Sequence, residues 1–120
     1  MYICFMEEKQ VTLYDPKKKK NIKVLIEAYI NKNGDLVFGE YDFSSSSSEY
    51  FGSDIEIDLV IKKTEKEKFI KIIQRSSKKV TNDISLLKWL EKKYSKLSAL
   101  YNIERLLKIN KISYTRTRWP

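Results

Sequence analysis

The sequence predicts an α+β domain, in which an antiparallel β-meander is followed by two or three helices and a C-terminal strand. The main observation is a change of hydrophobic period along the chain. Apolar residues alternate with polar ones over much of residues 22–61, recur every three or four positions over residues 64–110, and alternate again over residues 111–119. A length of 120 residues allows one hydrophobic core, so residues 1–120 are expected to fold as a single domain.

The first half of the chain contains the strands expected for the meander. Residues 2–6 and 10–14 are rich in β-forming side chains and predict a hairpin or an edge strand. Residues 22–30 and 36–43 are expected to pair, because Asn33 and Gly34 supply the positive φ that a tight turn needs. Residues 55–61 follow a serine-rich linker, and their alternation predicts a strand with one buried face and one acidic, solvated face.

Helical periodicity begins at Thr64. The spacing of Thr64 and Glu67 predicts a capping box at the start of a first helix that ends near residues 76–77. Asp83 is expected to cap the second helix, and Asn110 to end the third in a left-handed conformation. The apolar positions assigned to the three helices are Phe69, Ile70, Ile72 and Ile73, then Leu86, Leu87, Leu90 and Tyr94, then Leu97, Leu100, Ile103, Leu106 and Leu107.

Composition excludes many kinds of chemistry. The chain has no histidine, which removes the commonest general base near neutral pH and the commonest metal ligand. Its one cysteine, Cys4, cannot form an intramolecular disulfide or a thiolate cluster, and its apolar surroundings are typical of a core position. The three glycines form no phosphate-binding loop. We therefore expect a protein that is not an enzyme, with no catalytic residues, no cofactor and no metal site.

The apolar segments also bear on location. None approaches the roughly 20 residues that span a bilayer, and residues 1–6 are too short and lack the cationic leader of a secretory signal. The single cysteine fits a reducing compartment. The sequence thus predicts a cytoplasmic protein with no membrane segment.

Charge is divided unevenly along the chain. The net charge of +8 combines 7 basic and 11 acidic residues in positions 1–60, or −4, with 17 basic and 5 acidic residues in positions 61–120, or +12. Residues 33–61 contain seven acidic residues and no Lys or Arg. This division predicts a bipolar surface rather than a uniformly basic one.

The acidic segment, residues 35–58, also carries aromatic side chains and is the predicted partner-binding region. Its carboxylates would attract a cationic protein, and its aromatic side chains would anchor the desolvated centre of the interface. The residues expected to bind the partner are Glu40, Tyr41, Asp42, Glu49, Tyr50, Phe51, Asp54, Glu56 and Asp58. Two other interpretations stay open: a solvated sheet face without function, and a carboxylate pair in an enzyme.

Several of these segments resemble small bacterial proteins, some of which are predicted immunity proteins of contact-dependent inhibition and other polymorphic toxin systems. The segments are Leu25-Ile-Glu-Ala-Tyr-Ile30, Asn33-Gly-Asp-Leu-Val-Phe-Gly-Glu-Tyr-Asp42, Tyr50-Phe-Gly-Ser-Asp54 and Ile55-Glu-Ile-Asp-Leu-Val-Ile61. The resemblance spans roughly residues 22–75 and 112–119, with a run of serines where a glycine-containing turn is expected after Asp42. It implies an immunity protein that binds its cognate toxin and blocks the active site or a required contact.

Basic residues in the second half support an alternative function. They are Lys71, Arg75, Lys78, Lys79, Lys88, Lys92, Lys93, Lys96, Arg105, Lys108, Lys111, Arg116 and Arg118. Gathered on one surface, such side chains bind phosphates, and Trp119 beside Arg118 would stack on unpaired bases. No homeodomain, RNP, KH or zinc-finger signature accompanies them. A small basic nucleic-acid-binding protein is therefore the second hypothesis, and a solvated helix face is the alternative to both.

Overall fold

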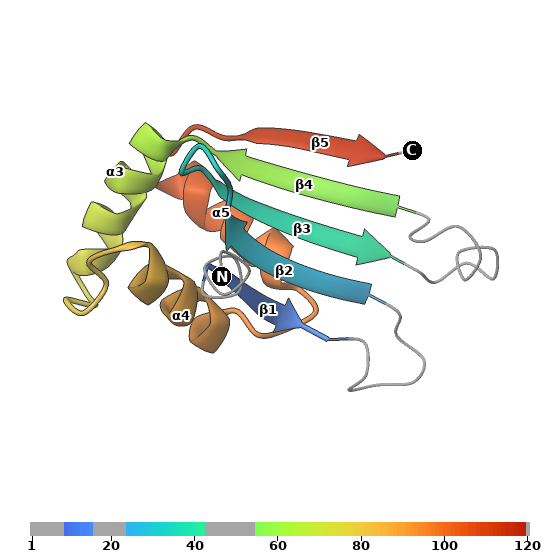
Figure 1. Cartoon of the computed structure of the whole chain (residues 1–120), viewed down its shortest axis with the longest axis horizontal. Helices are drawn as coiled ribbons and strands as arrows, with labels where there is room; N and C mark the ends of the chain where they lie inside the picture. Colours follow the sequence, from blue (N-terminus) through green and yellow to red (C-terminus); the bar gives the residue numbers. More distant parts are fainter. Residues whose placement is uncertain (1–8, 16–23, 43–54, 120) are drawn as a thin grey trace.

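The computed structural model describes residues 9–15, 24–42 and 55–119. They form a five-stranded antiparallel sheet and three helices (Figure 1). The strands are β1 (Gln10–Tyr14), β2 (Val24–Ile30), β3 (Leu36–Asp42), β4 (Ile55–Ile61) and β5 (Thr115–Trp119), and the helices are α3 (Lys63–Gln74), α4 (Asp83–Lys93) and α5 (Ala99–Ile109). The predicted α+β architecture is confirmed, including the C-terminal strand. The strand expected at residues 2–6, Cys4 and the serine-rich linker lie outside the described residues.

Strand order in the sheet follows chain order. β1 to β4 form the predicted meander, and β5 returns after the helices to pair with β4 at the opposite edge from β1. In the β2–β3 turn Gly34 has the predicted positive φ, at 83°, whereas Asn33, which was expected to share it, does not. The Asn31 side-chain oxygen accepts hydrogen bonds from the backbone N–H groups of Asn33 and Asp35, at 2.9 and 3.0 Å. These bonds satisfy turn donors and hold β2 and β3 in register.

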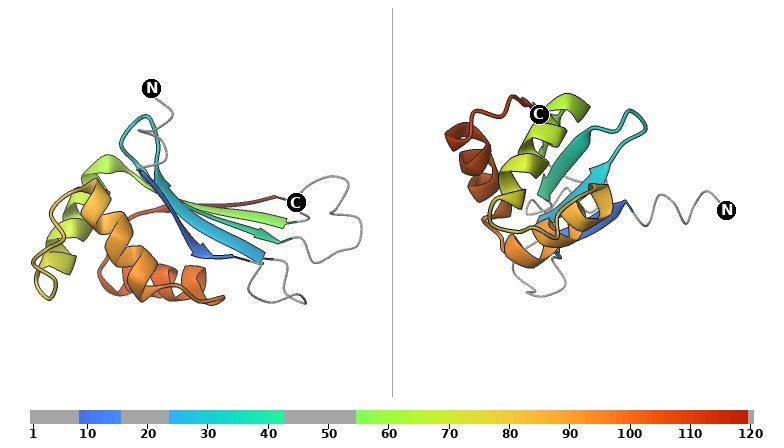
Figure 2. Two further views of the ribbon diagram at one scale, coloured as in Figure 1. Left: turned by 60° about the horizontal axis from the view of Figure 1, so that its bottom comes forward. Right: turned by 90° about the vertical axis from the view of Figure 1, so that its left-hand side faces the viewer.

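The two faces of the sheet differ in chemistry. On the helix-covered face, Ile26, Ala28, Phe38, Leu59 and Ile61 are completely buried beneath the helices. The opposite side, which we call the open face, has no described helix or strand over it (Figure 2). Because side chains alternate along a strand, each strand contributes to both faces.

The helices complete the core from their apolar stripes. The predicted stripe positions Phe69, Leu86, Leu90, Ile103 and Leu107 are fully buried and join the sheet residues in one cluster. Ile72 and Leu106 are half-buried against the same cluster, and two other predicted positions lie outside their helices. Leu97 precedes α5 and is exposed, and Tyr94 is the half-buried residue that follows α4.

The start of α3 is capped from outside the helix, and the predicted Thr64 capping box is wrong. Thr64 lies inside α3, and Lys62 at the N-cap position makes no side-chain cap bond. Asp35 from the β2–β3 turn takes this role: its Oδ1 accepts the backbone N–H of Lys63 at 2.9 Å. A residue 28 positions away therefore satisfies a free donor of the first turn.

The other two helix ends differ from the prediction by one residue each. Asn82, not Asp83, is the N-cap of α4, and it forms a reciprocal capping box with Ser85. At the end of α5 the left-handed residue is Lys111, with a φ of 56°, whereas Asn110 has a φ of −93°. The predicted ends were therefore close, but the residues with the expected geometry were their neighbours.

Candidate partner-binding site

Strand pairing arranges the open face in three rows that cross β2, β3, β4 and β5. The rows are Leu25, Tyr41, Glu56 and Trp119; then Glu27, Gly39, Asp58 and Thr117; then Tyr29, Val37, Val60 and Thr115. Directly opposed residues on neighbouring strands have Cβ atoms about 4.5–5.5 Å apart. Side chains within a row are therefore close enough to act together.

The open face is acidic and aromatic. Its three rows carry the carboxylates of Glu27, Glu56 and Asp58, and no row position holds a Lys or Arg. Three aromatic side chains lie among them, those of Tyr29, Tyr41 and Trp119, and Trp119 is 66% exposed. The carboxylates would attract a cationic group electrostatically, and the aromatic rings provide apolar area for contact with a partner.

Tyr41 lies across Gly39 and reaches Glu27. A Cβ atom built on Gly39 would be 2.6 Å from Tyr41 Oη, so a larger residue here would displace the Tyr41 ring from its present position. Tyr41 Oη donates to Glu27 Oε1 at 3.2 Å, and Gln10 Nε2 donates to Glu27 Oε2 at 2.9 Å. Partial burial, with the charges of Glu27, Asp58 and Glu56, raises the pKa of the Tyr41 hydroxyl. The Glu27 carboxylate is therefore engaged within the sheet.

Glu56 and Asp58 are placed differently from Glu27. They lie two residues apart on the same face of β4, and no described Lys or Arg forms an ion pair with either. Desolvation raises the pKa of Glu56, and the neighbouring charge and hydrogen bond of Asp58 raise it further. A cation brought by a partner would relieve this repulsion.

The residues predicted to bind the partner divide between the two faces. Tyr41, Glu56 and Asp58 lie on the open face. Glu40 lies on the helix-covered face, because its paired residues are Ile26 and Ile57, and Asp42 two positions on lies there as well. The remaining members, Glu49, Tyr50, Phe51 and Asp54, lie outside the described residues.

Glu40 also has a different electrostatic environment from the open-face acids. Burial raises its pKa, the charge of Asp42 adds to this, and Arg116 on the same side of the sheet opposes it. The acidic segment therefore supplies carboxylates to both faces, and only some of them contribute to the field of the open face.

Asp35, the first acid of the acidic segment, serves the fold. It is 4% exposed and caps α3. Burial opposes its ionisation, but hydrogen bonds from the Lys63 backbone and Asn31, with the charge of Lys62, outweigh burial and lower its pKa.

The predicted partner-binding set did not include three charged or aromatic residues of the open face: Glu27, Tyr29 and Trp119. Alternation alone places Glu27 and Tyr29 on the other face of the strand from the buried Ile26 and Ala28, so the sequence itself indicates which face they occupy. Their proximity to Glu56 depends on strand order and register, which alternation does not determine.

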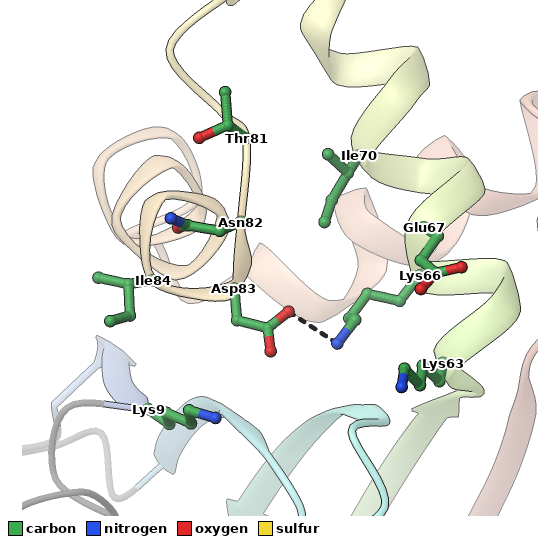
Figure 3. Close-up of a pocket in the computed structure, with 9 residues that line it drawn as sticks. All are labelled: Lys9, Lys63, Lys66, Glu67, Ile70, Thr81, Asn82, Asp83 and Ile84. Carbon is green, nitrogen blue, oxygen red and sulfur yellow. Dashed lines mark ion pairs between the residues drawn. The ribbon is translucent and has the colours of Figure 1, made fainter.

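A groove of about 440 Å³ lies away from the open face, between α3 and the start of α4 (Figure 3). Lys66 projects from α3 into this groove and is 4% exposed. Its Nζ atom lies 2.7 Å from Asp83 Oδ1 and donates to the Gly34 carbonyl oxygen at 2.6 Å. The buried lysine is thus fully partnered and joins α3, α4 and the β2–β3 turn.

Basic residues gather on the helical part of the molecule. Residues 63–111 contain 14 Lys and Arg and 5 Asp and Glu, a net charge of 14 − 5 = +9. Most of these cations are exposed. The acidic open face and the basic helices therefore form oppositely charged parts of the molecule.

Comparisons with known proteins return no match: no protein-family model, no curated protein and no solved structure matches the chain. Within residues 9–15, 24–42 and 55–119, no helix has the length and apolar character needed to cross a membrane. The same part of the chain holds no cluster of three or more potential metal-ligating Asp, Glu, His or Cys side chains. The open face is the surface on which a functional proposal rests.

Proposed function

We propose that this chain is an immunity protein that binds a cognate bacterial toxin domain in the cytoplasm and neutralises it by covering its active site or another required surface. The observation that carries the proposal is the open face, with three carboxylates, three aromatic side chains and no cation in its rows. Binding of this kind needs no catalytic residue and no cofactor. The resemblance of residues 22–75 to predicted immunity proteins supports the same function.

The partner is a domain with a cationic surface, such as a nuclease whose groove binds phosphates. Complementary charge raises the association rate and selects the partner. A partner cation close to Glu56 and Asp58 would attract both carboxylates and offset the repulsion between them. Trp119, paired directly with Glu56, adds exposed aromatic area beside them.

The test uses a candidate toxin domain that co-purifies with this chain from its native host, expressed in cells with and without the chain. Glu56→Gln together with Asp58→Asn should weaken binding about tenfold or more and reduce protection of cells, because two carboxylates facing the partner are lost. The control is Glu67→Gln with Glu91→Gln, which removes the same charge from exposed positions of α3 and α4. Full protection by the open-face variant would contradict the assignment.

A second pair of variants separates the two faces of the sheet. Glu40→Gln with Asp42→Asn also removes two acids of the predicted set, but from the helix-covered face. Binding should change by less than about threefold, measured by isothermal titration calorimetry with the toxin domain. A loss as large as that of the open-face variant would mean that total charge, rather than the open face, determines binding.

The nucleic-acid hypothesis has its own supporting observation on α5. Tyr101 is 65% exposed, and the Arg105 guanidinium lies 5.9 Å from its ring centre, a pairing that also suits base stacking. We expect single strands of about 20 nucleotides to bind weakly and to dissociate between about 50 and 200 mM salt. Binding that persists at the higher salt and is lost in Arg105→Glu with Lys108→Glu would favour this hypothesis instead.

A further inference from the structure

β5 is an edge strand with an accessible backbone. All five residues, Thr115–Trp119, are exposed. The strand pairs with β4 in regular register from Thr115 opposite Val60 to Trp119 opposite Glu56, and no described strand pairs with its outer side (Figure 1). In an antiparallel sheet, alternate residues of an edge strand direct both N–H and C=O away from their neighbour. Within the described residues, the outer edge of β5 therefore presents backbone donors and acceptors that have no strand partner.

The other edge of the sheet is a poorer template for pairing. The register of β1 with β2 shifts between Thr12 and Tyr14, and a shift of this kind bends and twists a strand. α4 also packs against β1. Of the two edges, β5 is the regular and exposed one.

On one face of β5 the side chains carry positive charge, which would favour a negatively charged partner strand. Arg116 and Arg118 lie on the helix-covered face, because they pair with Leu59 and Ile57. Arg116 Nε is 3.6 Å from Glu104 Oε1 yet the side chain stays 46% exposed, and Arg118 forms no ion pair with a described acid. A strand added to this edge would be stabilised by acidic side chains opposite the two arginines.

A second copy of the chain does not meet this requirement. Antiparallel pairing of two β5 strands about Thr117 would place Arg116 of each copy opposite Arg118 of the other. Like charges directly opposed across strands are destabilising, and charged edge residues are a known obstacle to self-association. The edge therefore fits a different chain better than its own.

We infer that the outer edge of β5 binds an extended segment of a partner protein as a sixth strand, with acidic side chains facing Arg116 and Arg118. Backbone hydrogen bonds supply the attachment, and the alternating acidic side chains supply the selectivity. On the other face of the added strand, apolar side chains lie beside Thr117 and Trp119. This inference goes beyond the proposed function and does not depend on the identity of a toxin.

The probe is a blocked peptide of alternating Glu and Val, titrated into the ¹⁵N-labelled full chain. Amide shifts should concentrate in β5 and in the adjoining residues of β4. A peptide of the same sequence, N-methylated at alternate residues, keeps the side chains but cannot form the strand ladder, so it should produce no such shifts. This control leaves the protein unchanged.

Charge selectivity is tested on the protein side. Arg116→Glu with Arg118→Glu should bind the Glu/Val peptide at least about tenfold more weakly and should prefer a Lys/Val peptide. Glu56→Gln with Asp58→Asn should bind the Glu/Val peptide like the parent, which separates this test from that of the proposed function.

Three results would overturn the inference. One is the absence of amide shifts in β5 at millimolar Glu/Val peptide, and another is equal binding of the N-methylated peptide. The third is a dimer in sedimentation velocity that the peptide dissociates, because a second copy would then occupy the edge.

Discussion

Glu56 shows how one carboxylate can disfavour folding and favour binding. Its pKa is raised by desolvation and by Asp58, so its charged form is less stable in the folded chain than in the unfolded one. A group with a raised folded pKa contributes most to stability below its unfolded pKa, and that contribution is lost as the pH rises through the folded pKa. At neutral pH, Glu56 therefore lowers stability while it supplies charge to the open face.

Glu56→Gln should accordingly stabilise the free protein at neutral pH. We expect a rise in melting temperature of about 1–2 °C at pH 7, kept small by solvent screening, and no rise at pH 3, where Glu56 is protonated in both states. Thermal unfolding followed by circular dichroism measures both. Glu91→Gln on α4 is the control and should change neither. A lower melting temperature for Glu56→Gln at pH 7 would show that Glu56 has a stabilising contact.

At the scale of elements, one buried lysine joins three of them. Lys66 belongs to α3, its ion-pair partner Asp83 begins α4, and its carbonyl partner Gly34 lies in the β2–β3 turn. Asp35 from the same turn caps α3. The turn and the two helix starts therefore share one polar junction, in which removal of the buried Lys66 or Asp35 leaves polar groups without their partners.

Lys66→Met should destabilise the chain by about 2–3 kcal/mol in urea unfolding, because Asp83 and the Gly34 carbonyl lose a charged donor. The loss is below that of a completely buried pair because the Asp83 side chain is 26% exposed. Lys71→Met, on an exposed position of α3, is the control and should change stability by less than about 0.5 kcal/mol. Adding Asp83→Leu to Lys66→Met should recover part of the loss, and no recovery would contradict an ion-pair role.

The described strands β1 to β4 and the three helices share one core. One cluster of buried residues includes β1 to β4 and all three helices, so sheet and helices should unfold together. The two tryptophans report on different parts: Trp89 lies in α4, where its Nε1 donates to Ser77 Oγ at 3.1 Å, and Trp119 lies in β5.

Trp89→Phe keeps Trp119 in the sheet as its fluorescent reporter, and Trp119→Phe keeps Trp89 in the helical layer. The unfolding curve of each variant should nevertheless have the same midpoint by fluorescence as by circular dichroism. Phe38→Ala should lower stability by about 3–5 kcal/mol in both backgrounds, since Phe38 is fully buried. Fluorescence midpoints that differ between the layers, or a Phe38→Ala effect confined to one of them, would contradict a single cooperative core.

The predictions from sequence succeeded where structure is local. Alternation identified the faces of β2, with Ile26 and Ala28 buried, and helical spacing identified Leu86 and Leu90 as core positions. The Asn33 and Gly34 turn is equally local, because its conformation depends on backbone freedom at Gly34. Periods of 2 and 3.6 follow from strand and helix geometry itself, so they can be recognised without knowing what packs nearby.

Features that join distant segments were decided by the tertiary structure. The sequence by itself determined the α+β class, the element order and the presence of an acidic segment. It did not separate Glu40 from Glu56, because their faces depend on the β3–β4 register, and it did not place Trp119 beside Glu56 or Asp35 at the start of α3. The physical reason is that register and helix position are set by burial of the whole core, whereas periodicity is a property of each segment.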